Sequence, residues 1–199
     1  MQDDLHAEPH ALWEEAAALW DTHQNDKGWE GYVSADYVAL FEQLLQLRGK
    51  VSSVLEWGSG LGVVTIMASR LGFDAYGIES EYVLVDLSHQ LALKYGPAAR
   101  FAEGSFIPDD FEWDLEIGDE TFRTDAVARS AYDQFDMELR DFDLVYAYPW
   151  PEEFPLFHNI LRKCGGDHAL LLTYNVRDGL EMTRFRSDRE GEAPAEPPG

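Results

Sequence analysis

The sequence predicts an α/β fold in which helices cover both faces of a doubly wound, mainly parallel sheet. Short apolar segments of strand length alternate with helical patterns from residue 51 onward. This alternation is typical of right-handed βαβ units. A glycine-rich turn joins the first apolar segment directly to a helix, and the first two apolar segments each end in a glutamate. The pattern therefore places carboxylates at one edge of a parallel sheet.

Two helices are expected ahead of the sheet, so that residues 1–50 form an N-terminal helical cap. Leucine, tryptophan and alanine recur at helical spacing over residues 9–22. Ser34 is expected to cap a second helix with apolar positions between residues 37 and 45, and Gly49 follows its end. Trp29 and Tyr32, just before the second helix, either form a lid over a ligand or pack the cap onto the sheet.

The sheet domain is expected to span residues 51–186. Strands are predicted at about 51–55, 75–78, 100–102, 143–147 and 168–173, and helices at about 62–71, 82–95 and 151–162. Gly72 ends the first of these helices, and the Gly96-Pro97 pair ends the second.

A long acidic segment, residues 109–142, separates the third and fourth strands. Its 12 acidic and three basic residues give it a formal charge of −9. We interpret it as an insertion over the sheet edge or the site, with a possible helix at 126–135; the alternative is a solvated connection. Residues 187–199 are rich in Pro, Glu and Gly, which predicts a disordered tail.

Charge and composition restrict the partners of the protein. The chain has 199 residues and a formal net charge of −23, which disfavours nucleic-acid backbones and anionic lipid, since both require clustered Lys and Arg. Cys164 is the single cysteine, so no internal disulfide forms. No apolar stretch is long enough for a membrane span, and the acidic N-terminus has no apolar run behind it, so no signal peptide is expected. The expectation is a cytoplasmic protein; the histidines show no metal-binding pattern.

The segment from Glu56 to Gly62 carries the strongest functional signal. Its spacing is G-x-G-x-G, whereas the dinucleotide fingerprint G-x-G-x-x-G requires a third glycine where Val63 stands. Glu56 beside the turn repels a pyrophosphate but attracts an ammonium or a sulfonium. Glu79, at the end of the second strand, is suited to accept hydrogen bonds from a ribose diol. Together these features favour S-adenosyl-L-methionine (SAM) over NAD.

These motifs resemble those of class I SAM-dependent methyltransferases. The segment 56–62 resembles their motif I, 76–79 resembles the acidic strand end that follows, and 143–149 resembles their fourth-strand motif. The resemblance implies a Rossmann-like sheet of order 3-2-1-4-5 and SAM as the cofactor. Few residues remain after the fifth strand, so the C-terminal strands that the resemblance implies are expected to be shortened. The cofactor-binding residues that it implies are Glu56, Gly58, Ser59, Gly60, Gly62, Glu79, Ser105 and Phe106.

Two departures from this family's pattern concern the cofactor and the acceptor. Ser105 stands where the family often has Asp near the adenine. At the end of the fourth strand, Tyr148-Pro149-Trp150-Pro151 resembles the Asn-Pro-Pro-Tyr loop of N-methyltransferases and, more closely, the Pro-Asp-Pro-Trp-Pro-Lys loop of tRNA guanine-N7 methyltransferases. Tyr148 replaces their Asn or Asp, and Glu152 replaces the tRNA enzymes' Lys, which argues against tRNA.

The sequence therefore predicts a SAM-dependent methyltransferase that acts on a small-molecule or protein acceptor. Tyr148 is the candidate catalytic residue, and Tyr146 and Trp150 are the candidate substrate-binding residues. Acidic side chains expected near the mouth of the site, Glu152 and Glu153 or Asp109 and Asp110 of the acidic segment, suit a cationic acceptor such as an amine or a lysine-bearing peptide. Alternatives are that Pro149-Trp150-Pro151 only turns the chain, that the protein is a SAM-binding sensor or interaction module without transferase activity, and that it binds NAD.

Overall fold

A six-stranded sheet in the order β3-β2-β1-β4-β5-β6 forms the centre of the protein. The computed structural model describes residues 4–29, 33–112, 124 and 128–184. β1 to β5 are parallel, and β6 runs antiparallel to β5. The predicted fold class and the order 3-2-1-4-5 are confirmed. The strands are β1 (Ser53–Trp57), β2 (Asp74–Glu79), β3 (Arg100–Glu103), β4 (Leu144–Ala147), β5 (Leu170–Asn175) and β6 (Gly179–Arg184).

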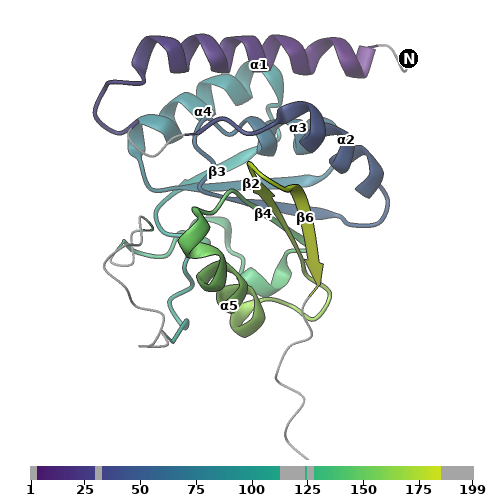
Figure 1. Ribbon diagram of the computed structural model, residues 1–199, viewed down its shortest axis with the longest axis vertical. Coiled ribbons are helices and arrows are strands. Elements are labelled where there is room, and N and C mark those ends of the chain that lie inside the picture. The colour runs from purple at the N-terminus through teal and green to yellow at the C-terminus, as the bar shows by residue number, and fades with distance from the viewer. Residues whose placement is uncertain (1–3, 30–32, 113–123, 125–127, 185–199) are drawn as a thin grey trace, which may run out of the picture.

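Helices cover the sheet on both sides (Figure 1). One face carries α2, α3 and α4, with α1 lying across them as an outer layer, and the other face carries α5. Apolar side chains that alternate along each strand form two separate cores, one on each face. The helices are α1 (Asp4–His23), α2 (Tyr37–Leu47), α3 (Val63–Arg70), α4 (Tyr82–Tyr95) and α5 (Phe154–Cys164), with 3₁₀ turns η1 (Tyr132–Phe135), η2 (Leu139–Asp141) and η3 (Pro151–Glu153).

The N-terminal helices pack directly on the helices of the sheet. The indole N–H of Trp13 in α1 donates to the sulfur of Met67 in α3 at 3.1 Å. Trp29 is fully buried, and its ring lies 5.5 Å from that of His23 and 6.2 Å from that of Trp20. The burial of Trp29 favours the packing role over the lid, and Tyr32 lies outside the described residues.

The cap of α2 differs from the prediction. Asp36, not Ser34, is the N-cap: its Oδ1 accepts a hydrogen bond from the backbone N–H of Ala39 at 3.0 Å. Ser34 lies two residues too far from the helix for this role, and its hydroxyl instead donates to the Tyr37 hydroxyl at 3.2 Å. Asp36 therefore satisfies one of the free N–H groups of the first turn.

Other differences concern the last elements and the acidic segment. The helix expected from residue 151 begins with η3 and becomes α-helical at Phe154, because Pro151 and Pro155 restrict the backbone there. Within the described part of 126–135, the possible helix is only the four-residue turn η1. β6 pairs with β5 over all six of its residues, so one added strand is present among the described residues. The predicted tail, 187–199, lies outside them.

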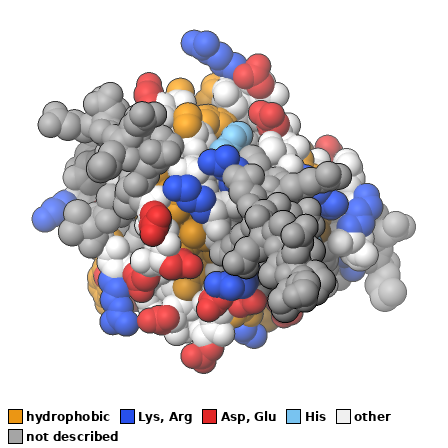
Figure 2. Space-filling view, turned by 90° about the horizontal axis from the view of Figure 1, so that it is seen from below, with side chains coloured by type: hydrophobic (Ala, Val, Ile, Leu, Met, Phe, Trp, Pro, Cys, Tyr) orange, Lys and Arg blue, Asp and Glu red, His pale blue; other side chains and the backbone are white. Residues whose placement is uncertain are grey.

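On the face seen from below in Figure 2, acidic and basic side chains are interspersed over the described residues. No helix among the described residues is both long and apolar enough to cross a membrane.

Candidate functional site

The turn between β1 and α3 is built on backbone that favours glycine. Gly58, Gly60 and Gly62 have φ angles of 66°, 52° and 70°, in the left-handed region where a Cβ atom is unfavourable. The turn is anchored to β2 by two hydrogen bonds, from Ser59 N to Ile78 O at 2.9 Å and from Gly60 N to Glu79 Oε2 at 2.8 Å. The alternating glycines therefore reflect the geometry of this turn.

Gly62 has a packing role in addition to its position in the turn. It is the N-cap of α3, and a Cβ atom there would lie 2.4 Å from the ring of Phe101 and 3.0 Å from Cβ of Ser88. Gly62 therefore brings α3 close to β3 and α4.

Glu56 lies beneath the turn and is almost completely buried, with 5% of its surface exposed. Its Oε2 accepts hydrogen bonds from the backbone N–H and the hydroxyl of Thr65 in the first turn of α3, at 2.9 and 2.6 Å. The carboxyl group thus caps a helix whose own N-cap is a glycine. Burial raises the pKa of Glu56 to about 8, although the hydrogen bonds from Thr65 act in the opposite direction.

Glu79, at the end of β2, links the β1–α3 turn to the loop that follows β2. Its Oε2 accepts from Gly60 N, and its Oε1 accepts from Ser80 N at 2.7 Å and Glu81 N at 3.0 Å. These bonds fix the carboxylate in position before any ligand arrives. A carboxylate has four lone-pair sites, so Oε2 retains acceptor capacity for a diol.

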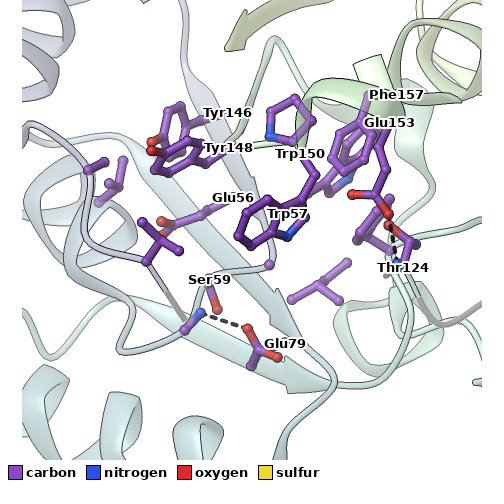
Figure 3. A pocket seen from close by; sticks show the side chains of 18 of the residues that line it. Glu56, Trp57, Ser59, Glu79, Thr124, Tyr146, Tyr148, Trp150, Glu153 and Phe157 are labelled. Atoms are coloured by element: carbon purple, nitrogen blue, oxygen red, sulfur yellow. Dashed lines mark hydrogen bonds between the residues drawn. The ribbon is translucent and has the colours of Figure 1, made fainter. Parts of the chain in front are cut away.

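A cavity of about 480 Å³ opens at the carboxyl ends of the strands (Figure 3). Its volume is in the usual range for a small-molecule site, and its position is the one at which doubly wound sheets bind ligands. All the sequence-predicted site residues except Gly62 line it: Glu56, Gly58, Ser59, Gly60, Glu79, Ser105, Phe106, Tyr146, Tyr148 and Trp150.

One wall of the cavity is aromatic. The ring of Phe106 stacks on that of Trp57 at 4.9 Å with an interplanar angle of 16°, and Phe157 lies 5.0 Å from Phe106 and 5.7 Å from Trp57. The indole N–H of Trp57 donates to the Tyr132 hydroxyl at 3.0 Å, and this hydroxyl donates to Phe106 O at 2.9 Å. The wall is therefore rigid. The hydroxyl oxygen of Ser105 accepts from Ile107 N at 3.1 Å and closes the adjacent turn.

Tyrosines form the opposite wall. Tyr146 pairs in register with Glu56 across β1 and β4, so the two side chains share one face of the sheet. Burial, reinforced by Glu56, raises the pKa of Tyr146 well above its usual value. The ring of Tyr148 meets that of Tyr174 edge-on at 5.1 Å, and its pKa is raised by burial and by Tyr174. Both phenols therefore keep their protons at neutral pH.

Two hydroxyl oxygens in this region are buried without a hydrogen-bond partner in the part of the chain that the structure describes. They are Ser59 Oγ and Tyr146 Oη, and both residues line the cavity. A buried unsatisfied hydroxyl is costly. Such groups in a cavity wall are suited to meet the polar atoms of a ligand.

Several lining residues escaped the sequence analysis. Trp57 lies within the glycine motif, and its place after Glu56 in a strand was a signal that it faces the other side of the sheet. Phe157, Thr124 and Arg177 also line the cavity. No local pattern identifies these three, because α5, the acidic segment and the β5–β6 turn bring them to the site. Of the acids expected near the mouth, Glu153 lines the cavity, whereas Glu152, Asp109 and Asp110 are exposed and do not.

Methyltransferases are among the solved structures that align with this chain. An RNA methyltransferase from Salinibacter ruber in complex with S-adenosyl-L-homocysteine aligns with a TM-score of 0.51 at 17% identity, covering 83% of this chain and 98% of that chain. An O-methyltransferase from Bacillus cereus in complex with S-adenosyl-L-homocysteine (SAH) aligns with a TM-score of 0.54 at 14% identity, covering 86% of this chain and 67% of that chain. No protein-family model matches the sequence, and no curated protein sequence does. The chain thus has the Rossmann-like fold of class I methyltransferases.

Proposed function

We propose that the protein binds SAM in this cavity and transfers its methyl group to an acceptor at the end of β4. The observation that carries the proposal is the convergence of Glu56, Glu79 and the glycine turn on one cavity at the carboxyl edge of a 3-2-1-4-5 sheet. Related folds that hold S-adenosyl-L-homocysteine, the product of methyl transfer from SAM, support the same cofactor.

Each group of residues is assigned one part of the cofactor. Glu56 faces the ammonium of the methionine portion, and Glu79 accepts from the ribose diol. The positive end of the α3 dipole suits the carboxylate of the methionine portion. Bound SAM supplies a methyl group that passes from its sulfonium to a lone pair on the acceptor, leaving S-adenosylhomocysteine. The protein residues align the two reactants and exclude water.

The acceptor is assigned to the β4 end of the cavity. Tyr148 remains protonated because its pKa is raised, so it orients the acceptor through its hydroxyl and does not remove a proton. Trp150 and Tyr146 provide aromatic surface for stacking. Among the residues that the structure describes, the charged ones that line the cavity are Glu56, Glu79, Glu153 and Arg177. The three acids in this set support a cationic small molecule or protein side chain as the acceptor.

Titration calorimetry with SAM, S-adenosylhomocysteine and NAD tests the cofactor assignment. Both adenosyl compounds are expected to bind and NAD is not. Glu79→Ala is expected to weaken SAM binding at least tenfold, because it removes the diol acceptor and the acceptor that holds Gly60 N. Unchanged affinity in this variant, compared with the exposed Glu42→Gln control, would refute the ribose role.

Labelled methyl transfer into a cell extract tests the transferase assignment. SAM with a labelled methyl group is incubated with the protein and a fractionated extract, and the label is followed into small molecules and proteins. Glu79→Ala serves as the binding-deficient control. SAM binding without label transfer to any fraction would favour a SAM sensor over a transferase.

A further inference from the structure

Tyr146 has a buried hydroxyl for which the proposed cofactor contacts provide no partner. Only 3% of its surface is exposed, and its Oη has no hydrogen-bond partner among the described residues. Ser59 Oγ shares this property, but it belongs to the glycine turn and therefore to the side of the cofactor. A buried unsatisfied hydroxyl lowers stability. We therefore expect the hydroxyl of Tyr146 to meet a ligand at the β4 end of the cavity.

The side chain of Tyr146 lies where the proposed function places the acceptor. Tyr146 is in β4 and stands directly opposite Glu56 on the neighbouring strand. Figure 3 shows it beside Tyr148, with Glu56 on the same side of the cavity and Glu153 on the other. The carboxyl group of Glu56 contributes to the raised pKa of the Tyr146 phenol. The same negative potential favours a positively charged ligand group beside this hydroxyl.

The groups around Tyr146 favour an accepting atom that needs no base. An alcohol or a phenol loses its proton as it gains the methyl group, so it requires a proton acceptor in the site. Tyr146 and Tyr148 keep their own protons because their pKa values are raised. Glu56 accepts from Thr65 and is assigned to the cofactor. The described lining residues include no histidine or lysine.

An amine nitrogen meets this condition. It is cationic when protonated, which suits the acidic lining, and it has a lone pair once the proton is lost to water. A carboxylate or a thiolate needs no base either, but Glu56, Glu79 and Glu153 line the cavity and disfavour an anion. In the transfer the nitrogen lone pair forms the new bond to the methyl carbon, and the electron pair of the broken bond returns to sulfur. The positive charge passes from sulfur to nitrogen and stays in the cavity.

We propose that Tyr146 Oη accepts a hydrogen bond from an N–H of the acceptor, so that the site methylates primary and secondary amines and discriminates against tertiary amines. This inference rests on the proposed SAM-dependent transfer. A neutral primary or secondary amine directs its lone pair at the methyl group while an N–H donates to the hydroxyl, which fixes the orientation of the nitrogen. A tertiary amine has no N–H in its reactive form and leaves the hydroxyl unsatisfied. Methylation therefore stops at the tertiary amine.

A matched series of benzylamines tests the requirement for an N–H. SAM with a labelled methyl group is supplied with benzylamine, N-methylbenzylamine or N,N-dimethylbenzylamine, and with benzyl alcohol as the oxygen counterpart. The phenyl ring of these probes suits the aromatic lining of the cavity. The wild-type chain is expected to label the first two amines at least about tenfold faster than N,N-dimethylbenzylamine, which is the size of effect expected for one buried hydrogen bond. Benzyl alcohol should remain unlabelled.

Tyr146→Phe is the matched variant, because it removes the hydroxyl and keeps the ring. Its preference for N-methylbenzylamine over N,N-dimethylbenzylamine is expected to fall below about threefold, through slower methylation of the secondary amine. The Kd for S-adenosylhomocysteine, measured by calorimetry, should not change, which separates a contact with the acceptor from one with the cofactor. The control Tyr95→Phe removes a hydroxyl whose partners lie in α1 and should keep the wild-type preference.

Three results would overturn this inference and leave SAM binding intact. They are a wild-type preference retained by folded Tyr146→Phe, faster labelling of N,N-dimethylbenzylamine or benzyl alcohol than of the other amines, and a loss of S-adenosylhomocysteine affinity in Tyr146→Phe of about tenfold or more.

The remaining outcomes distinguish this inference from the proposed function. Label in a compound of the cell extract but in none of the amines would overturn the inference alone. Binding of S-adenosylhomocysteine without label in the amines or the extract would overturn the transferase assignment as well. Failure of S-adenosylhomocysteine to bind the wild-type chain would overturn the whole proposed function, and this inference with it.

Discussion

Glu56 makes the stability of the protein depend on pH in a predictable direction. The usual pKa of this carboxyl is 4.5, and burial raises it to about 8 in the folded protein. The folded state therefore holds a proton on Glu56 over a pH range in which the unfolded chain releases it. It follows that this residue's contribution is most favourable below about pH 4.5 and becomes less favourable as the pH rises to about 8.

The size of this change in stability follows from the difference between the folded-state and unfolded-state pKa values of Glu56. They differ by about 3.5, and each pH unit corresponds to about 1.4 kcal/mol, so complete ionisation of Glu56 lowers the free energy of unfolding by about 5 kcal/mol. At pH 7 the loss is about 3 kcal/mol. Domains of this size are stable by only about 5–15 kcal/mol, which makes the effect measurable.

Glu56→Gln removes the titration and preserves an oxygen that accepts from Thr65. Urea unfolding of both proteins from pH 5 to 9 is expected to show that the variant becomes more stable relative to the wild type by about 1 kcal/mol per pH unit up to pH 8. From pH 8 to 9 the further increase should be only about 0.4 kcal/mol. Glu42→Gln, an exposed change in α2, should follow the wild type at every pH. If wild-type and Glu56→Gln stabilities remain parallel over this range, the buried carboxyl does not titrate as argued.

Three further changes test the site and its support. Gly62→Ala is expected to lower the free energy of unfolding by about 3 kcal/mol, because Ala is strained at this positive φ and its Cβ atom would clash with Phe101. The control Gly49→Ala also has a positive φ but faces open space, so it should lower the free energy of unfolding by only about 1 kcal/mol. Equal losses in urea unfolding would contradict the packing role of Gly62. Tyr146→Phe removes a buried hydroxyl without a described partner and should raise the free energy of unfolding by about 1 kcal/mol; a loss would show that the hydroxyl is bonded. Tyr148→Phe should reduce kcat about tenfold with the Kd for SAM unchanged; full activity would exclude Tyr148 from acceptor positioning.

Local sequence patterns were sufficient for the elements of the sheet. The strand–turn–helix unit at Gly58 to Gly62 depends on backbone angles that few other residues adopt, so its spacing was informative by itself. Element ends were less predictable where two signals competed. Ser34 and Asp36 are both good capping residues. Which of them caps the helix depends on the tertiary packing of Tyr37, the first residue of α2, and local sequence does not reveal that packing.

The site was predictable to the extent that its residues follow a strand. The cavity residues of the β1–α3 turn and of β4 are contiguous in sequence and were identified from it. Glu153 is different, because its hydrogen-bond partner Thr124 lies 29 residues earlier, in the acidic segment. Thr124 belongs to no recognisable motif, and only the folded chain brings it to Glu153 beside the aromatic wall.

The chemistry of Glu56 indicates why the site uses acids. A glutamine at this position has an oxygen that would accept the same hydrogen bonds from Thr65 and would cap α3 without the cost of ionisation near pH 8. Helix capping alone therefore does not account for a carboxyl group there. A cation placed against it does, because the nearby positive charge offsets the burial that raises its pKa. Under the proposed function, Glu56 and Glu79 therefore meet the positive charge and the hydroxyl donors of one ligand.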